Sequence, residues 1–419
     1  MKTAETPVPT ATPGRASAGR ALIVAAVVDA IGDGLFIVVS TLYYARVLNL
    51  SAQQVGSAFI VAGVLGLLTG IGVGRLADVR GPSHVYRTIL VTQSLTAALL
   101  LLVDSFPLFV GSLTLIMCAE RANRAVRGGL VARIATPDTR VKLRATIRAG
   151  VNLGAALGSL GGAVAVHLDT ESAFRWAIAA NALSYLVALA LLTRLPRFTP
   201  LPRPEGIGRW TALRDTRYIT VTGLTGVMTM NILVITVGLP LWIALKTEAP
   251  LLTIPAVFLI NTLLVVALQR ALSKGADSLR GAAAKSRNAG LMLLAACLLM
   301  PASGYTRPVL ATVIILIAVV VHSLGSIGQA ASAFGLSFEL APEHAISEYQ
   351  GVFGLAAGIA SAFGAGLVTY LCVEAGPVGW VVLGTLFAVT GAAMPPVVRW
   401  AAARPTQPPR PPHTHGGAR

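Results

Sequence analysis

The chain alternates between long apolar runs and short polar breaks. A helix needs about 20 mostly apolar residues to cross the roughly 30 Å hydrocarbon core of a bilayer, and twelve runs come close to or exceed that length. They cover residues 21–43, 53–73, 84–103, 107–128, 147–167, 173–193, 218–244, 251–271, 287–304, 308–333, 348–372 and 378–400. The pattern predicts an all-α membrane protein with twelve transmembrane helices.

The longest polar connection separates the sixth run from the seventh. It covers residues 194–217 and holds four prolines and six arginines, which indicates a linker between two six-helix bundles. The bundles would comprise residues 21–193 and 218–400. The terminal segments, residues 1–20 and 401–419, are rich in proline and lack apolar periodicity, so we expect disordered tails.

Composition supports a lipid environment. Only 12% of the 419 residues are charged and 55% are hydrophobic, whereas soluble domains carry roughly 25% charged residues. The net charge of +16 does not indicate nucleic-acid binding, because the basic residues fall between apolar runs and not in patches with aromatic residues. The three cysteines are odd in number and have no ligand spacing, so neither a disulfide framework nor a metal site is predicted.

Lysine and arginine residues orient the helices, because positively charged loops stay on the cytoplasmic side. With both tails inside, all but four of the 33 basic residues are cytoplasmic, including Arg148 at the start of the fifth run. The four exceptions are Arg46, Arg175, Lys246 and Arg307. We therefore expect a multi-pass protein of the plasma (cytoplasmic) membrane with both termini in the cytoplasm and no cleaved signal peptide.

One loop breaks this charge pattern. The segment from Glu339 to Glu348 holds three acidic residues and no lysine or arginine. The sequence offers no physical explanation for it.

Two aspartates in the first run are the strongest site residues. Asp29 and Asp33 are four positions apart, so they share one face of a helix. A carboxylate facing lipid is too costly to retain, and both are expected to face a cavity, another helix or each other. Two close carboxylates disfavour double ionisation, which suits a site that gains and loses a proton. The alternative is a cap or an ion pair that only locks this helix.

A histidine in the tenth run is a second site residue. His322 lies in mid-span, where it would either relay protons and bind substrate or form a hydrogen bond to a neighbouring helix.

The segment after the second run carries a family resemblance. It reads Gly74-Arg-Leu-Ala-Asp78-Val-Arg80-Gly81 and resembles the loop signature G-x-x-x-D-R-x-G-R-[RK] of the major facilitator superfamily. Val79 departs from it, since the family usually has arginine there. The resemblance implies a gating role for Asp78, which would contact neighbouring helix ends and hold one of two alternating states.

The second half echoes this signature. Asp277 is followed by Arg280 and Gly281 after the eighth run. An aspartate followed by Arg-Gly after the second span of each half fits the parallel repeat of this superfamily, so the two bundles are expected to be pseudo-repeats.

The fourth and fifth runs carry two further resemblances. Arg124-Ala-Val-Arg127-Gly-Gly looks like the R-x-x-Q-G signature of proton-coupled members, and the alternative is a basic cytoplasmic helix end. The fifth run resembles the exporter signature G-x-x-x-G-P-x-x-G-G, with serine in place of proline. Glycines four residues apart also allow close helix packing, and this is the simpler interpretation. These glycines are Gly150, Gly154, Gly158, Gly161 and Gly162.

These features favour a secondary transporter, in particular a proton-coupled exporter of a small amphipathic molecule, such as a drug or secondary metabolite, that works by alternating access. It would act as a monomer in the lipid bilayer, with protons and a small-molecule substrate as partners and no cofactor. We expect Asp33 to be the main proton-coupling residue, with Asp29 as its partner and Arg124 tuning it.

An importer of a small nutrient and a non-transporting membrane sensor are the alternatives. An enzyme is not expected, because no nucleophile with a placed base, metal cluster or phosphate-binding glycine loop is present in the sequence. The substrate charge stays open, because the aspartates of the first helix suit a cation and the arginines of the fourth suit an anion.

Overall fold

The structure is a computed structural model that describes residues 13–193, Phe198 and residues 210–403. Most of the expected linker and most of both expected tails lie outside these residues. Every regular element in the described part is helical, which confirms the all-α class.

The first half of the chain contains six long helices. They are α1 (Pro13–Leu42), α2 (Ala52–Arg80), α3 (Pro82–Leu100), α4 (Phe106–Ile134), α5 (Pro137–Leu168) and α6 (Glu171–Leu192), with a π-helical turn η1 (Tyr43–Val47) after α1.

The second half contains more and shorter pieces. They are α7 (Thr211–Arg214), α8 (Thr216–Thr229), α9 (Asn231–Leu233), η2 (Val234–Gly238), α10 (Leu239–Lys246), α11 (Thr253–Leu272), α12 (Leu279–Ser303), α13 (Pro308–Glu339), η3 (Glu343–Ala345), α14 (Ile346–Thr369), η4 (Tyr370–Glu374) and α15 (Gly376–Ala402).

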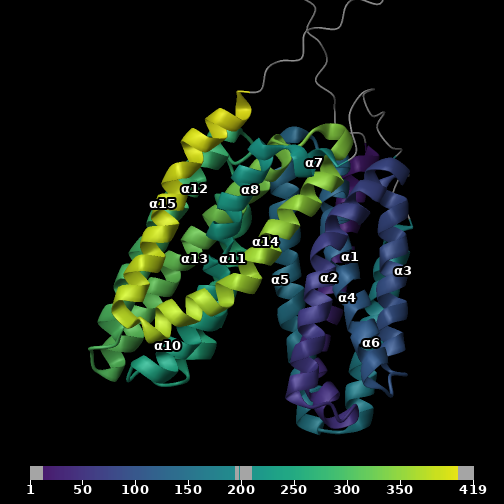
Figure 1. Ribbon diagram of the computed structural model, residues 1–419, viewed down its shortest axis with the longest axis horizontal. Coiled ribbons are helices and arrows are strands. Elements are labelled where there is room, and N and C mark those ends of the chain that lie inside the picture. Colours follow the sequence, from purple (N-terminus) through teal and green to yellow (C-terminus); the bar gives the residue numbers. More distant parts are fainter. Residues whose placement is uncertain (1–12, 194–197, 199–209, 404–419) are drawn as a thin grey trace, which may run out of the picture.

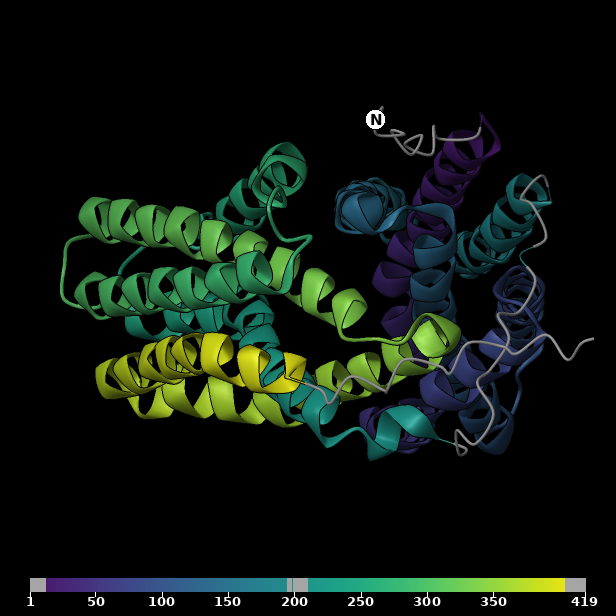
Figure 2. The same ribbon diagram turned by 90° about the horizontal axis from the view of Figure 1, so that it is seen from above.

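The helices form two groups. Figure 1 shows α1–α6 together on one side and α8–α15 on the other, and the groups converge at the end where α7 lies and diverge at the opposite end. Seen from above in Figure 2, the two groups again lie side by side. Contacts between them run mainly from α14 to α2 and α4 and from α11 and α13 to α5. Because α2, α4 and α5 all belong to the first half, these contacts join the two halves of the sequence.

Each predicted apolar run coincides with one helix or with consecutive helical pieces. By length and hydropathy alone, nine stretches of the described residues qualify as membrane spans. The three runs that fall short lie in α3, α4 and α12, where polar and charged residues lower the mean hydropathy. Large apolar side chains such as Leu102, Leu160 and Trp176 are exposed, which fits a lipid surrounding.

Local signals explain several helix ends. Ser51 and Gln54 form a reciprocal capping box at the start of α2. Proline occupies the first turn of α3, α4, α5 and α13, where its missing N–H has no partner to lose. Gly81 turns the chain between α2 and α3 with φ of 94°, a conformation that favours glycine.

The glycine face of α5 packs directly on α1. A Cβ atom at Gly154 would lie 2.6 Å from the backbone oxygen of Val27, and one at Gly158 would overlap the backbone oxygen of Ile31. Gly150 and Gly162 also face α1, whereas a Cβ at Gly161 would meet only a leucine side chain at 3.5 Å. The glycines therefore let the two backbones approach closely and fix the position of the aspartates on α1.

Candidate functional site

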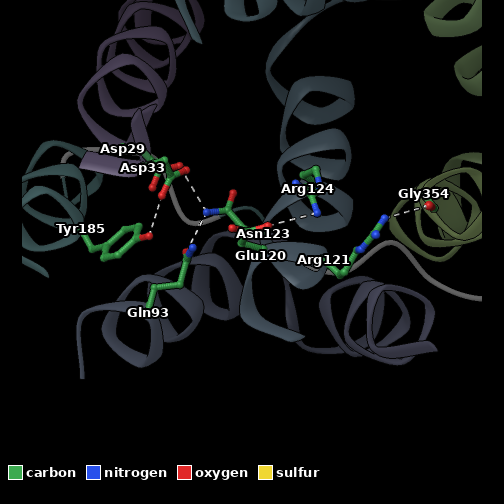
Figure 3. Close-up of polar contacts among 9 residues, drawn as sticks. All are labelled: Asp29, Asp33, Gln93, Glu120, Arg121, Asn123, Arg124, Tyr185 and Gly354. Carbon is green, nitrogen blue, oxygen red and sulfur yellow. Dashed lines mark hydrogen bonds and ion pairs between the residues drawn. The ribbon is translucent and has the colours of Figure 1, made fainter. Parts of the chain in front are cut away.

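A buried polar cluster surrounds Asp29 inside the first helix group (Figure 3). Asp29 is only 4% exposed. Asn123 of α4 donates through Nδ2 to Asp29 Oδ2 at 3.4 Å and to Gln93 Oε1 of α3 at 2.8 Å. Arg127, one turn further along α4, places Nη1 3.6 Å from Asp29 Oδ2. The charge of Asp29 is therefore compensated by a partly buried cation.

Asp33 lies one turn further along α1 in a different setting. The hydroxyl of Tyr185 on α6 donates to Asp33 Oδ1 at 2.7 Å. Within the described part of the chain, Asp33 forms no ion pair with lysine or arginine. A Cβ atom at the neighbouring Gly32 would overlap Ser184 Oγ, so α1 and α6 are in close contact here. Asp33 thus has a neutral donor, whereas Asp29 has a neutral donor and a cation.

The other side of α4 carries two further arginines. Arg124 forms an ion pair with Glu120 one turn earlier, with Nη2 3.3 Å from Oε2. Arg121 donates to the backbone oxygen of Gly354 on α14 at 3.5 Å. In Figure 3, Asn123 points towards the aspartates, whereas Arg121 and Arg124 point away from them. Helix α4 therefore stands between the acidic cluster and these two arginines.

A cavity of about 450 Å³ lies between the two helix groups. Residues of α4, α5, α8, α11, α13 and α14 line it, together with α9 and η2. Its charged and amide side chains, together with one histidine, are Arg124, Arg148, Asn152, Asn261, His322 and Gln329. No described residue that lines this cavity is acidic. Its walls also contain apolar side chains, so the cavity suits a molecule with both polar and apolar parts.

His322 is buried in the wall of this cavity and is 2% exposed. The next residue, Ser323, donates to Asn261 Oδ1 at 3.0 Å, and Gln329 donates to Thr229 Oγ1 at 3.2 Å. These contacts join α13 to α11 and α8. They place His322 in the second helix group, away from the acidic cluster of the first.

A carboxylate joins the two groups at the end where they converge. Asp78, near the end of α2, accepts hydrogen bonds from the backbone N–H groups of Ser347 at 3.1 Å and Glu348 at 2.8 Å. Both donors lie in the first turn of α14, where the helix dipole favours a negative charge. A Cβ atom at Gly74 would overlap the backbone oxygen of Ser347, so only glycine allows this approach. We name these contacts the Asp78 clasp.

Asp277 does not form an equivalent clasp. It lies in the loop between α11 and α12, and its Oδ1 is buried without a hydrogen-bond partner among the described residues. Burial raises the pKa of this carboxyl, and the charge of Lys142 on α5 opposes the rise. The loop approaches the beginning of α5, where Ala276 packs on Val141.

The acidic loop that the sequence left unexplained has partners in the structure. Glu343 forms an ion pair with Arg140 of α5 at 3.3 Å, and Glu348 accepts from the backbone N–H of Ala212 at 3.0 Å. Both contacts bind the start of α14 to residues far away in the sequence. The ion pair of Glu343 joins the two halves, and the contact of Glu348 ties α14 to α7 within the second half.

The family follows from a comparison with family models. The model described as Major Facilitator Superfamily matches residues 22–365. The chain belongs to this superfamily. A comparison with the sequences of curated proteins finds no match.

Several solved structures of transporters share the fold of this superfamily member. The human organic anion transporter MFSD10 (TETRAN) has 15% identity and a TM-score of 0.68, covering 91% of this chain and 100% of that chain. A bacterial homologue of the iron transporter ferroportin, in an outward-facing state, has 13% identity and a TM-score of 0.73, covering 92% and 100%. The transporter FucP in its outward conformation has 15% identity and a TM-score of 0.65, covering 91% and 98%.

The superfamily motifs fall on different parts of this geometry. Arg80 of the loop signature lines a groove between α2, α3 and α4, whereas Asp78 faces the first turn of α14. Arg124 of the helix-4 signature lies on the cavity side of α4, where it pairs with Glu120. The arginine that reaches Asp29 is Arg127.

Sequence reasoning missed several residues of these sites. Arg127 and Asn123 are four positions apart, and this spacing was the available signal that they share a face of α4. Arg148 was assigned to a basic flank, but α5 begins at Pro137 and carries Arg148 into the cavity wall. Tyr185 is uncharged and lies in an apolar run, so nothing in the sequence marks it as a site residue.

Proposed function

We propose that the chain is a secondary active transporter that works by alternating access. The observation that carries this proposal is a cavity lined by both halves of the chain. The Asp78 clasp lies at the end where the two helix groups converge. In this proposal all twelve helical segments cross the bilayer, as two six-helix bundles at residues 21–193 and 218–400. The substrate binds between the bundles, and Asp78 holds the state that is closed at the clasp.

The basic residues support an orientation with both termini in the cytoplasm of the cell, in the plasma membrane. The clasp then closes the cytoplasmic side. A single cysteine introduced at Ser17 or at Thr406, which lies outside the described residues, should resist impermeant thiol reagents in intact cells. The native cysteines are replaced first. Ready labelling at either position would overturn this orientation.

Proton coupling belongs to the acidic cluster in this proposal. Asp29 has a partly buried arginine partner and is suited to stay charged. Asp33 has a tyrosine hydroxyl and no cation, so less stabilises its charge inside the bilayer. Asp33 is therefore the residue that gains and loses the proton. The ion pair of Asp29 and Arg127 sets the electrostatic potential around it.

Export of a small amphipathic molecule is the direction that we propose. The mixed polar and apolar lining of the cavity supports an amphipathic substrate. The glycine face of α5, which resembles an exporter signature, supports export. Import of a nutrient on the same fold would reverse the preferred direction in flux measurements with everted and right-side-out vesicles.

The test of coupling is proton movement in everted vesicles when a panel of candidate substrates is added. Asp33→Asn should abolish proton-driven transport while downhill exchange persists, and Asp29→Asn should shift the pH dependence without abolishing transport. Asp104→Asn, in the exposed loop between α3 and α4, is the matched control. Proton coupling at the wild-type level in Asp33→Asn would refute the assignment and leave His322 as the next residue to test.

A further inference from the structure

Arg148 is a cation without a partner in the cavity wall. It lies on α5 and lines the cavity between the helix groups. None of the hydrogen bonds, ion pairs or ring contacts found among residues 13–193 and 210–403 involves Arg148. Within a bilayer an arginine is costly unless a counter-charge or water offsets it. The contents of the cavity must therefore provide that compensation.

The surroundings of Arg148 add positive charge. Arg124 lines the same cavity, and its partner Glu120 does not. A smaller adjoining cavity of about 130 Å³ is lined by Arg121, Arg124 and Arg144. Like-signed charges around a concave site with apolar walls focus the potential on its interior. An anion in this cavity is attracted, and a cation is repelled.

Glu120 pairs with Arg124 from outside the lining, and no carboxylate of the described residues pairs with Arg148. Neither Asp29 nor Asp33 lines the cavity, and α4 lies between them and Arg124 (Figure 3). The structure thus separates the acidic residues that would suit a cation from the arginines that suit an anion. Among the charged residues that the structure describes, arginines alone line the cavity.

The remaining lining fits the rest of an organic anion. Asn152 follows Arg148 by one helical turn and adds an amide donor. Ile235, Val265 and Phe353 contribute apolar walls. A guanidinium group matches a carboxylate or sulfonate through two parallel N–H donors. The cavity volume of about 450 Å³ is within the usual range for small-molecule sites.

We propose that this cavity binds a small organic anion, a carboxylate or sulfonate with an apolar body, through Arg148 with Arg124 as the second cation. This inference rests on the proposed transport function, because it names the substrate class of the same cavity. In this arrangement the anion site and the proton site are separate, on opposite sides of α4.

The test measures binding to the purified full-length protein in lipid nanodiscs, without a proton gradient. The probes are 2-naphthoate and 2-naphthylmethylammonium, which have similar apolar bodies and opposite charges. Calorimetry should show binding of the anion and markedly weaker binding of the cation. Arg148→Gln should weaken naphthoate binding about 10- to 100-fold, the range expected for loss of a charged hydrogen-bonding partner. Arg148→Lys should recover part of this loss.

Two controls separate binding from folding. Arg307→Gln removes an exposed arginine before α13, far from the cavity lining, and should leave the affinity unchanged. Each variant is compared by melting temperature, and Arg148→Gln should melt no lower than the wild type because it breaks no internal contact.

Three results would overturn the inference. They are no naphthoate binding at millimolar concentration, unchanged affinity in Arg148→Gln, and tighter binding of the ammonium probe. Proton-coupled transport of a cation would refute the anion site and leave the transport proposal intact. Anion binding that depends on Arg148, without any transport in vesicles, would support the anion site and refute the transport proposal.

Discussion

Replacing Asp78 by asparagine should release the end at which the two helix groups converge. The carboxylate accepts two backbone hydrogen bonds from the first turn of α14, at 3.1 Å from Ser347 and 2.8 Å from Glu348. Asparagine keeps one acceptor oxygen, and its NH₂ group faces the second backbone donor. It also removes the negative charge that the helix N-terminus favours.

The magnitude follows from these two contacts. A hydrogen bond to a charged group contributes about 1.5–3 kcal/mol, and a charge at a helix terminus contributes about 0.3–1 kcal/mol or somewhat more when partly buried. The substitution should therefore cost the state closed at the clasp about 2–4 kcal/mol. At about 1.4 kcal/mol for each tenfold change, the ratio of the two alternating states shifts by about 30- to 700-fold.

Spin labels report this shift directly. One pair at Ser172 and Glu248 measures the separation of the groups at the diverging end, and a pair at His84 and Lys274 measures it at the clasp end. All four side chains are exposed. In Asp78→Asn the first distance should shorten and the second lengthen, with normal membrane insertion and slower transport.

The matched control for this experiment is Asp104→Asn, which removes an exposed carboxylate from a loop. Distance distributions that are the same in Asp78→Asn, the control and the parent protein would refute the reasoning. The clasp contacts would then contribute nothing to the balance between states.

Two further substitutions test the packing of the first group. Arg127→Gln should destabilise the protein by about 3–5 kcal/mol, because it leaves Asp29 buried without its cation, and adding Asp29→Asn should recover most of the loss in melting temperature. If Arg127→Gln alone were as stable as the parent protein, the expected role of this ion pair would be contradicted. Gly158→Ala places a Cβ atom on a backbone oxygen of α1 and should cost about 1–3 kcal/mol, whereas Gly161→Ala should be neutral. Equal melting temperatures for these two variants would show that α1 moves away at no cost.

The helical fold was predictable because membrane spans leave a strong signal. A run of about 20 apolar residues has few other uses, and each predicted run overlaps one helix or several consecutive helical pieces. Helix ends were less predictable. Helix α5 begins at Pro137, well before the apolar run that starts at residue 147. The helix includes basic residues that a hydropathy pattern assigns to a loop. The π-helical turns η2 and η4 likewise have no signature in hydropathy.

The charged residues of the site could be predicted from the sequence, but their contact partners could not. Asp29 and Asp33 are conspicuous because carboxylates are rare in an apolar run. Their partners depend on the rotation of α4 about its axis, which decides that Arg127 and not Arg124 faces α1. The acidic loop shows the same limit, because Glu343 pairs with a residue of α5 from the other half of the chain.

The two faces of α4 have a consequence for how such a protein diversifies. Substitutions at Arg121 and Arg124 change the surface turned towards the cavities, whereas Asn123 and Arg127 touch the acidic cluster. Natural selection can therefore alter the chemistry of the bound molecule while the residues that we propose for proton coupling stay the same. A lineage that keeps the face of α4 beside the acidic cluster and varies the face beside the cavities would retain one proposed proton-coupling site while its substrates change.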